Sequence, residues 1–170
     1  MRYGSLLCVL LLSCQGKAYF DSAVEFPSLN TKATFSIASA KEDILVLNFF
    51  APDCPPCIEE MPALKKFNQN LPKGLTFVGI GSVLEAVGEK LPSTDPEVVN
   101  RVKKFKQEYQ VAYPVFLAGS DQLESLKVTG FPETLIFKRE KDGYQLRRRH
   151  LSAITYEELI AFTSNLNEPW

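Results

Sequence analysis

The sequence is poor in cysteine and histidine and carries almost no net charge. Its 170 residues include four cysteines and one histidine, and two of the cysteines, Cys8 and Cys14, lie in an N-terminal leader. The remaining pair, Cys54 and Cys57, is too small a set for a disulfide framework or a tetrahedral zinc site. A formal net charge of -1 provides no global field that would recruit nucleic acid. We therefore expect no nucleic-acid partner, no resident metal and no cofactor.

Beyond the leader, no apolar run is long enough to span a bilayer, which takes about 20 residues. Residues 1–20 have the pattern of a signal peptide, with Arg2 before a short apolar run. That run ends in residues 11–14, which resemble a bacterial lipobox in which Cys14 is lipidated and anchors the protein. Ordinary cleavage near residues 16–18 is the alternative. Either route predicts a protein that works outside the cytoplasm, in the periplasm, where disulfide chemistry is sustained.

One stretch, residues 44–57, carries the chemical signal. A buried-strand pattern at Ile44–Phe50 ends in a turn, and Cys54-Pro55-Pro56-Cys57 then opens an amphipathic segment. A thiol at a helix N-terminus faces unpaired backbone N–H groups and the positive end of the helix dipole, which favour its thiolate. A second thiol one turn later can close a disulfide with the first. The spacing predicts a dithiol redox centre in which Cys54 attacks as the exposed thiol and Cys57 resolves the mixed disulfide.

The rest of the chain alternates strand and helix patterns. Residues 15–28 read as a tether, and residues 82–94 have no strong periodicity. The order predicts one α/β domain over residues 21–170, with a mixed central sheet flanked by helices. We expect strands at 33–38, 44–50, 75–80, 113–117, 134–137 and 144–150, and helices at 55–71 with a kink at Pro62, from 96 to about 109, at 120–127 and at 155–166.

These elements resemble the thioredoxin superfamily, and more narrowly its TlpA/ResA-like branch of extracytoplasmic thiol–disulfide oxidoreductases. The resemblance runs from Phe26 to the C-terminus. It is carried by residues 48–64 around the Cys-Pro-Pro-Cys motif, by the loop 130–134, and by the long segment between the second and third main strands. It implies a thioredoxin-like fold, protein disulfides as substrates, and a membrane or thiol-protein electron donor. Cytochrome c maturation is one common role within the branch.

Two positions depart from the thioredoxin pattern. Asp53 stands where the family has an aromatic residue before the first cysteine, and Asn48 stands where thioredoxin has a buried aspartate. Because an asparagine cannot accept a proton, the buried base is missing from that position. Glu85 is the nearest candidate for a replacement acid or base.

Three residues beside Cys54 indicate its redox poise. Pro55 and Pro56 have no N–H, so two donors to a Cys54 thiolate are absent. An ionised Asp53 would add a negative charge that also disfavours the thiolate. Both effects raise the pKa of Cys54 and favour a reductant over a strong oxidant, which would need a stabilised reduced form.

The loop around Pro132 is expected to complete the site. The resemblance implies a cis Pro132 packed beside the dithiol, and a Phe131 backbone free to pair with a bound peptide. Phe131 itself is either a substrate-facing residue or a core residue. The basic residues of 138–141 and 147–150 read as the solvated faces of a hairpin, and His150 has no expected catalytic role.

Two alternatives stay open. Cys54, Cys57 and Met61 supply soft sulfur ligands of the kind that suit Cu(I), so a copper-handling protein is the rival from another class. A disulfide oxidant or isomerase would use the same dithiol in the other direction.

Overall fold

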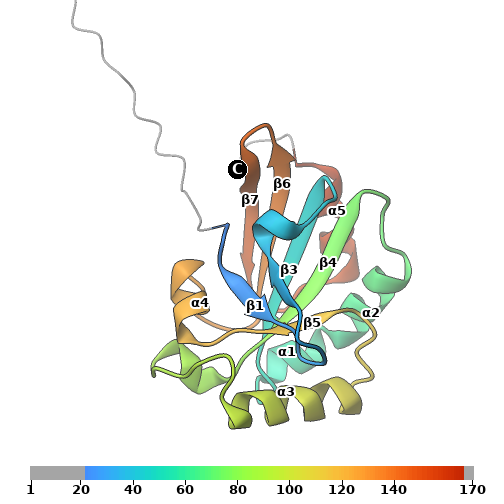
Figure 1. Cartoon of the computed structure of the whole chain (residues 1–170). Helices are drawn as coiled ribbons and strands as arrows, with labels where there is room; N and C mark the ends of the chain where they lie inside the picture. The colour runs from blue at the N-terminus through green and yellow to red at the C-terminus, as the bar shows by residue number, and fades with distance from the viewer. Residues whose placement is uncertain (1–21, 167–170) are drawn as a thin grey trace, which may run out of the picture.

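The structure, a computed structural model, describes residues 22–166. Its main sheet has five strands in the order β5-β4-β3-β6-β7 (Figure 1). The central strand β3 (Ile44–Phe50) pairs in parallel with β4 (Leu75–Gly81) and antiparallel with β6 (Glu133–Glu140). The outer strands are β5 (Val115–Leu117), parallel to β4, and β7 (Gly143–Leu151), antiparallel to β6. The sheet is thus mixed, as the sequence predicts.

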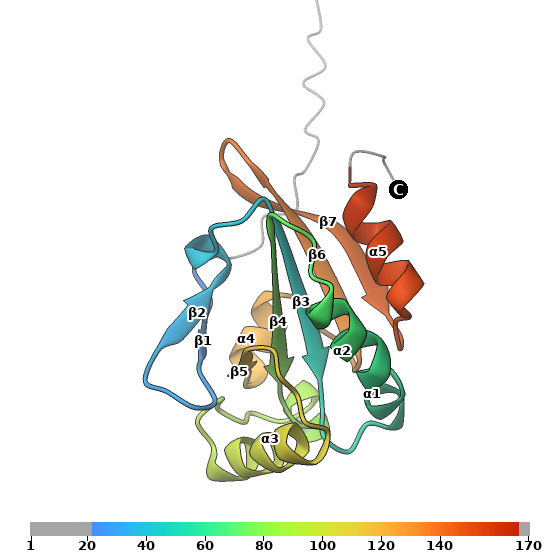
Figure 2. The ribbon, with the colours of Figure 1, turned by 90° about the vertical axis from the view of Figure 1, so that its right-hand side faces the viewer.

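Helices cover both faces of this sheet (Figure 2). On one face lie α1 (Pro55–Glu59), α2 (Met61–Gln69) and α5 (Tyr156–Ser164); α4 (Ser120–Ser125) lies on the other. The helix α3 (Pro96–Glu108) crosses the end of the sheet where β3 and β4 finish, and its Phe105 stacks on Phe50 with ring centroids 5.0 Å apart. The domain is a single thioredoxin-like α/β unit.

Local signals place several helix starts correctly. Asp95 caps α3 by accepting the Glu97 N–H at 2.8 Å, with Pro96 as the first helical residue. Thr155 and Glu158 form the capping box of α5. The expected kink near Pro62 is a full break, in which α1 ends and α2 begins around Glu60. A proline lacks the N–H that would continue the helix and crowds the carbonyl of the preceding turn.

The predicted tether at residues 15–28 is wrong in its described part. Residues Glu25–Pro27 form β1, which pairs antiparallel with β2 (Thr34–Ser36), a shorter strand than expected because a 3₁₀ turn follows at Ile37–Ser39. Phe26 is fully buried, and its ring meets that of Phe49 edge-on at 6.3 Å. The strand has only three residues, too few for an alternating pattern to stand out, so the sequence pattern could not reveal it.

The region 82–94 contains one short regular element, the 3₁₀ helix η2 (Leu84–Val87). The signal peptide predicted at residues 1–20, with Cys14, lies outside the described residues. Within residues 22–166, none of the helices combines the length and the apolar character that a membrane crossing requires.

The topology brings distant segments to one edge. The parallel strands β3 and β4 end at the same edge of the sheet, so the segments that follow them, with Cys54 and η2, meet there. The antiparallel strand β6 begins at that edge, because Glu133 pairs with Phe49. The edge therefore gathers the dithiol, η2 and the loop that contains Pro132.

Candidate active site

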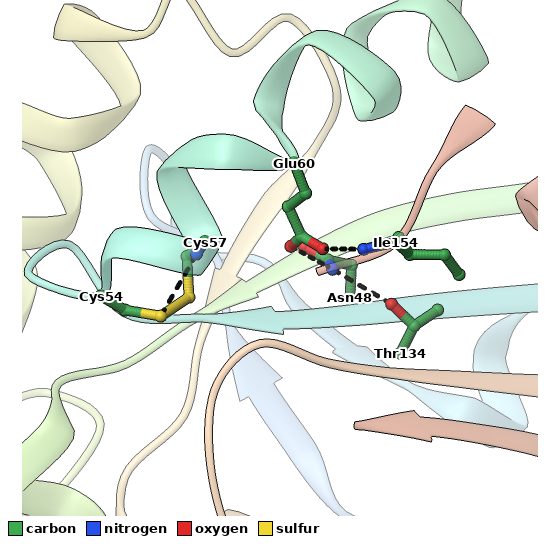
Figure 3. The surroundings of a disulfide bond; sticks show 6 residues. All are labelled: Asn48, Cys54, Cys57, Glu60, Thr134 and Ile154. Carbon is green, nitrogen blue, oxygen red and sulfur yellow. Dashed lines mark hydrogen bonds between the residues drawn. A yellow bond between two sulfur atoms is a disulfide. The ribbon is translucent and has the colours of Figure 1, made fainter. Parts of the chain in front are cut away.

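The two cysteines occupy the start of α1. Cys54 is the N-cap residue and Pro55 the first helical residue. Cys54 and Cys57 form a disulfide, with their Cα atoms 5.2 Å apart. The Cys57 N–H donates to the Cys54 sulfur at 3.3 Å (Figure 3). Because Pro55 and Pro56 have no N–H, this amide is the first along the helix that can donate to Cys54.

The prediction that Cys54 is exposed is wrong. Its exposed fraction is 3%, against 0% for Cys57. The Cys54 N–H turns back to the Ala51 carbonyl at 3.3 Å, and the bond to Cys57 draws the sulfur inward. Cys54 is still the less buried sulfur-bearing residue, so it remains the better candidate for first contact with a substrate.

The loop before β6 has the conformation that the resemblance implies. The peptide bond between Phe131 and Pro132 is cis, Pro132 is buried and Phe131 is half-buried against the core. The next residues, Glu133 and Thr134, pair with Phe49 and Asn48 near the end of β3. The structure therefore places Pro132 at the edge of the sheet that carries Cys54.

A buried carboxyl group, Glu60, lies one turn beyond Cys57 and was missed at the level of sequence. Its exposed fraction is 2%. The Asn48 side-chain amide donates to Glu60 Oε1 at 2.9 Å, and the Ile154 N–H donates to Glu60 Oε2 at 3.1 Å (Figure 3). The same Asn48 amide donates to Thr134 Oγ1 at 3.2 Å. Asn48 cannot itself accept a proton, but its amide binds a buried carboxyl group, Glu60, that can.

The surroundings of Glu60 bring its pKa close to neutral pH. Burial raises the pKa of Glu60 to about 7, although the hydrogen bonds from Asn48 and Ile154 act in the opposite direction by favouring the carboxylate. A carboxyl group poised near the working pH can accept or donate a proton. Glu60 is thus a buried group that can exchange a proton near neutral pH.

Tyr113 and Met61 pack next to this acid. The Tyr113 hydroxyl is buried and donates to the Met61 sulfur at 3.7 Å. Burial, together with the nearby Glu60 charge, raises the pKa of Tyr113, so its hydroxyl stays neutral. The Met61 thioether, which the copper alternative needs as a ligand, is engaged with this hydroxyl. Among the described residues, no three His, Cys, Asp or Glu side chains are grouped so that they could hold a metal ion.

Asp53 belongs to a surface network centred on Arg101. The Arg101 guanidinium pairs with Asp53, donates to both Glu85 carboxylate oxygens at 3.2 Å, and reaches Glu97 at 3.3 Å. Arg101 therefore offsets part of the negative charge of Asp53, which weakens the predicted effect of Asp53 on Cys54.

The same network binds Glu85 at the surface of the protein. Its side chain is 47% exposed. A hydrogen bond from its own backbone N–H, aided by Arg101, lowers the pKa of Glu85. A surface carboxyl with a lowered pKa does not hold a proton at neutral pH, so Glu85 does not replace the missing buried acid. Glu60 takes that place.

A helical pattern in the sequence does contain the signal for Glu60. Cys57, Glu60 and Leu64 follow one another at three- and four-residue steps, and all three are buried. A glutamate in phase with an inward stripe, one turn after the second cysteine, marks a buried acid beside the dithiol.

The chain matches the model of the Redoxin family over residues 21–140. Among individual proteins, the chain is similar to the thioredoxin-like protein YneN of Bacillus subtilis (strain 168), with 25% identity over 124 residues. That alignment covers 73% of this chain and 65% of YneN, which is less than two thirds of the relative's length.

Solved structures share the fold at low sequence identity. StoA from Bacillus subtilis matches with a TM-score of 0.63 and 18% identity, over 82% of this chain and 95% of StoA. A secreted disulfide oxidoreductase of Mycobacterium tuberculosis, homologous to DsbE of E. coli, matches with a TM-score of 0.61 and 22% identity, over 83% of this chain and 94% of that one. At such identities the likeness establishes the thioredoxin-like fold.

Proposed function

Since the chain belongs to the Redoxin family, we propose that it is a thiol–disulfide oxidoreductase that reduces disulfides in protein substrates. The observation that carries the proposal is the Cys54–Cys57 disulfide at a helix start, one turn from a buried carboxyl group. Cysteines that only pack in a core do not need a cap position, a helix dipole and a nearby acid.

The reaction begins with the reduced dithiol. The Cys54 thiolate, which accepts the Cys57 N–H, attacks one sulfur of the substrate disulfide and releases the other as a thiolate. The resulting mixed disulfide joins Cys54 to the substrate. Cys57 then attacks the Cys54 sulfur, releases the second substrate sulfur, and leaves the enzyme disulfide that the structure contains. Two electrons pass from the enzyme dithiol to the substrate.

Glu60 handles the proton in the second step. Cys57 must lose its proton before it can attack, and it is fully buried. The Glu60 carboxylate accepts this proton. With a pKa of about 7, the ionised group can act as a base at neutral pH, and the protonated group can then act as an acid. The proton then moves to the released substrate thiolate or to solvent.

The reductive direction rests on the two prolines. They leave the Cys57 amide as the nearest donor to Cys54, so the thiolate has less support than in a helix start with three free amides. Asp53 adds little to this effect, because Arg101 pairs with its carboxylate.

We place the activity outside the cytoplasm, with electrons supplied by a membrane or thiol-protein donor. The signal-peptide pattern of residues 1–20 supports export, and the similar Mycobacterium tuberculosis oxidoreductase is secreted. Lipid at Cys14 is the form of attachment, and cytochrome c maturation is one role open to it. Metabolic labelling with a fatty acid tests the anchor: Cys14→Ser should lose the label, and an unlabelled wild-type protein would exclude lipidation.

Trapping the mixed disulfide tests the proposed activity. Cys57→Ala removes the resolving thiol, so reduced C57A should accumulate covalent adducts with disulfide-containing proteins. Dithiothreitol should cleave these adducts. C54A, in which the attacking thiol is missing, is the matched control and should form none. If C57A forms no adduct, or if wild-type reduced protein releases no thiols from insulin, the proposal is refuted.

A further inference from the structure

In the side-chain amide of Asn48, the nitrogen has hydrogen-bond partners and the oxygen has none among the described residues. Its Nδ2 atom donates to Glu60 Oε1 at 2.9 Å and to Thr134 Oγ1 at 3.2 Å (Figure 3). Its Oδ1 atom is buried and has no hydrogen-bond partner among residues 22–166. Asn48 and Thr134 both have an exposed fraction of 0%. Buried polar atoms are nearly always paired, so the unpaired oxygen calls for a reason.

The observed hydrogen bonds suit only one form of Glu60. An ionised carboxylate accepts hydrogen bonds, so it pairs with the Asn48 NH₂ group. A protonated carboxyl carries an O–H that needs an acceptor. If the amide turned by a half rotation, Oδ1 would face Glu60 and Thr134 instead. The Thr134 hydroxyl can serve both arrangements because it donates as well as accepts.

We propose that Asn48 is a positioning residue whose amide reverses when Glu60 takes up a proton, so that both forms of the carboxyl group keep a partner. The inference rests on the proposed function, in which Glu60 exchanges a proton with Cys57. When the Cys57 proton reaches Glu60, the N–H···O bond from Asn48 breaks, and an O–H···O bond from Glu60 to Oδ1 forms. No electrons move in the reversal, and it runs backwards when the proton leaves.

The other groups near Glu60 cannot accept a hydrogen bond from its protonated form. The Ile154 N–H donates at 3.1 Å and has no acceptor to offer. Tyr113, from the segment before β5, senses the Glu60 charge but gives its own hydrogen to Met61. The Cys57 thiol is the source of the proton in the proposed reaction and so offers no second acceptor. Within the described part of the chain, no ion pair reaches Glu60.

Nuclear magnetic resonance on the full oxidised protein tests the reversal. We expect the Asn48 side-chain NH₂ signals and the Glu60 carboxyl carbon signal to share one midpoint between about pH 5 and 9. The nuclear Overhauser contact from the NH₂ group to the Thr134 methyl should weaken on the acid side. Asn48 signals that stay fixed while Glu60 titrates, as an amide locked by a bound water would show, overturn the proposal.

Variants separate reversal from simple packing. Thr134→Val keeps the volume but removes the second partner, so the Asn48 signals should shift less with pH; Thr134→Ser, which keeps the hydroxyl, should restore the wild-type response. Asn48→Leu should raise the Glu60 midpoint by about one pH unit, because the ionised form loses a charge-assisted hydrogen bond. An unchanged response in T134V, or an unchanged midpoint in N48L, contradicts the inference.

Insulin reduction by the wild-type protein distinguishes this failure from failure of the proposed function. If the wild-type protein reduces insulin while the Asn48 signals stay fixed, only the reversal is wrong. If it does not reduce insulin, the proposed function falls, and the reversal loses its role even if it is observed.

Discussion

At the scale of single residues, the chemistry of Cys54 and Cys57 depends on which neighbouring charges are compensated. Asp53 and Glu60 are both carboxyl groups near the dithiol, yet they differ in their surroundings. Asp53 is exposed and paired with Arg101, whereas Glu60 is buried and bonded only to neutral groups. The first therefore contributes a partly offset charge, and the second is the group that we propose exchanges a proton with Cys57.

Replacing Glu60 should expose its role as a base. In Glu60→Gln, resolution of the mixed disulfide should slow by about 10²-fold, because the Cys57 proton has lost its acceptor. In the wild type the rate should rise as the pH increases through about 7, where Glu60 ionises. Stopped-flow release of substrate from the mixed disulfide measures both.

The matched control is Glu59→Gln, on the exposed neighbour of Glu60 in the same chain segment. Its rate and pH profile should equal those of the wild type. An E60Q profile that still rises through pH 7 would assign the titration to another group.

Removing Arg101 should reveal the charge of Asp53. In Arg101→Gln the carboxylate beside Cys54 loses its cation, so the thiolate becomes less favourable. Alkylation of Cys54 by iodoacetamide at pH 7 should slow by about threefold, the size expected of a partly solvated charge. The double variant D53N/R101Q, which lacks both charges, should return to nearly the wild-type rate. Equal rates in all three proteins would show that Asp53 does not influence Cys54.

At the scale of elements, an ion pair between a buried carboxylate and a partly exposed arginine fixes the loop that carries Pro132. Glu133, at the start of β6, is 1% exposed and pairs with Arg149 of β7. Arg149 also donates to the carbonyls of Leu126 and Lys127, at 2.7 and 2.9 Å. Burial raises the pKa of Glu133, although Arg149 opposes this effect. Arg149 is thus a structural residue, and the prediction of solvated hairpin faces is wrong for it.

Arg149→Met should leave a buried carboxyl group without its cation. We expect a loss of about 3 kcal/mol in the free energy of unfolding, measured by urea denaturation. Arg147→Met is the control, because its pair with Glu140 is about one-third exposed and should contribute less than about 1 kcal/mol. The double variant E133Q/R149M should recover part of the loss; equal losses in R149M and R147M would contradict this account.

The elements also show how far a sequence can be interpreted. The run Ile44–Phe50 and the Asp95-Pro96 cap are local signals, and the corresponding elements form where they predict. The Asn48–Glu60–Ile154 bonds join residues up to 94 positions apart, so they depend on the register of β3 and on the segment before α5. The pairing of Asp53 with Arg101, 48 positions away, is equally non-local.

At the scale of the whole molecule, Glu60 links stability to pH. Its pKa is about 7 in the folded protein, against an ordinary value of 4.5 for a glutamate in the unfolded chain. Between these values the folded protein binds a proton that the unfolded chain does not, so stability falls as the pH rises through this window. The stabilisation is complete below about pH 4.5, and about 3 kcal/mol of it is lost above pH 7.

Urea denaturation of oxidised protein at several pH values measures this slope. E60Q cannot ionise at this position, so its stability should decline less between pH 4.5 and 7 than that of the wild type. Parallel curves for the two proteins would show that the unfolding free energy does not depend on Glu60.

The sheet order has a consequence for self-association. The strand β7 is nine residues long and lies at the outer edge of the sheet (Figure 1), whereas the other edge, β5, is partly covered through the bridge between Ser28 and Phe116. An open edge strand offers its backbone to a second chain, and charged side chains along it discourage such pairing. Arg147 and Arg148 lie on this edge strand, so light scattering should detect aggregation of R147T/R148T at concentrations where the wild type does not aggregate.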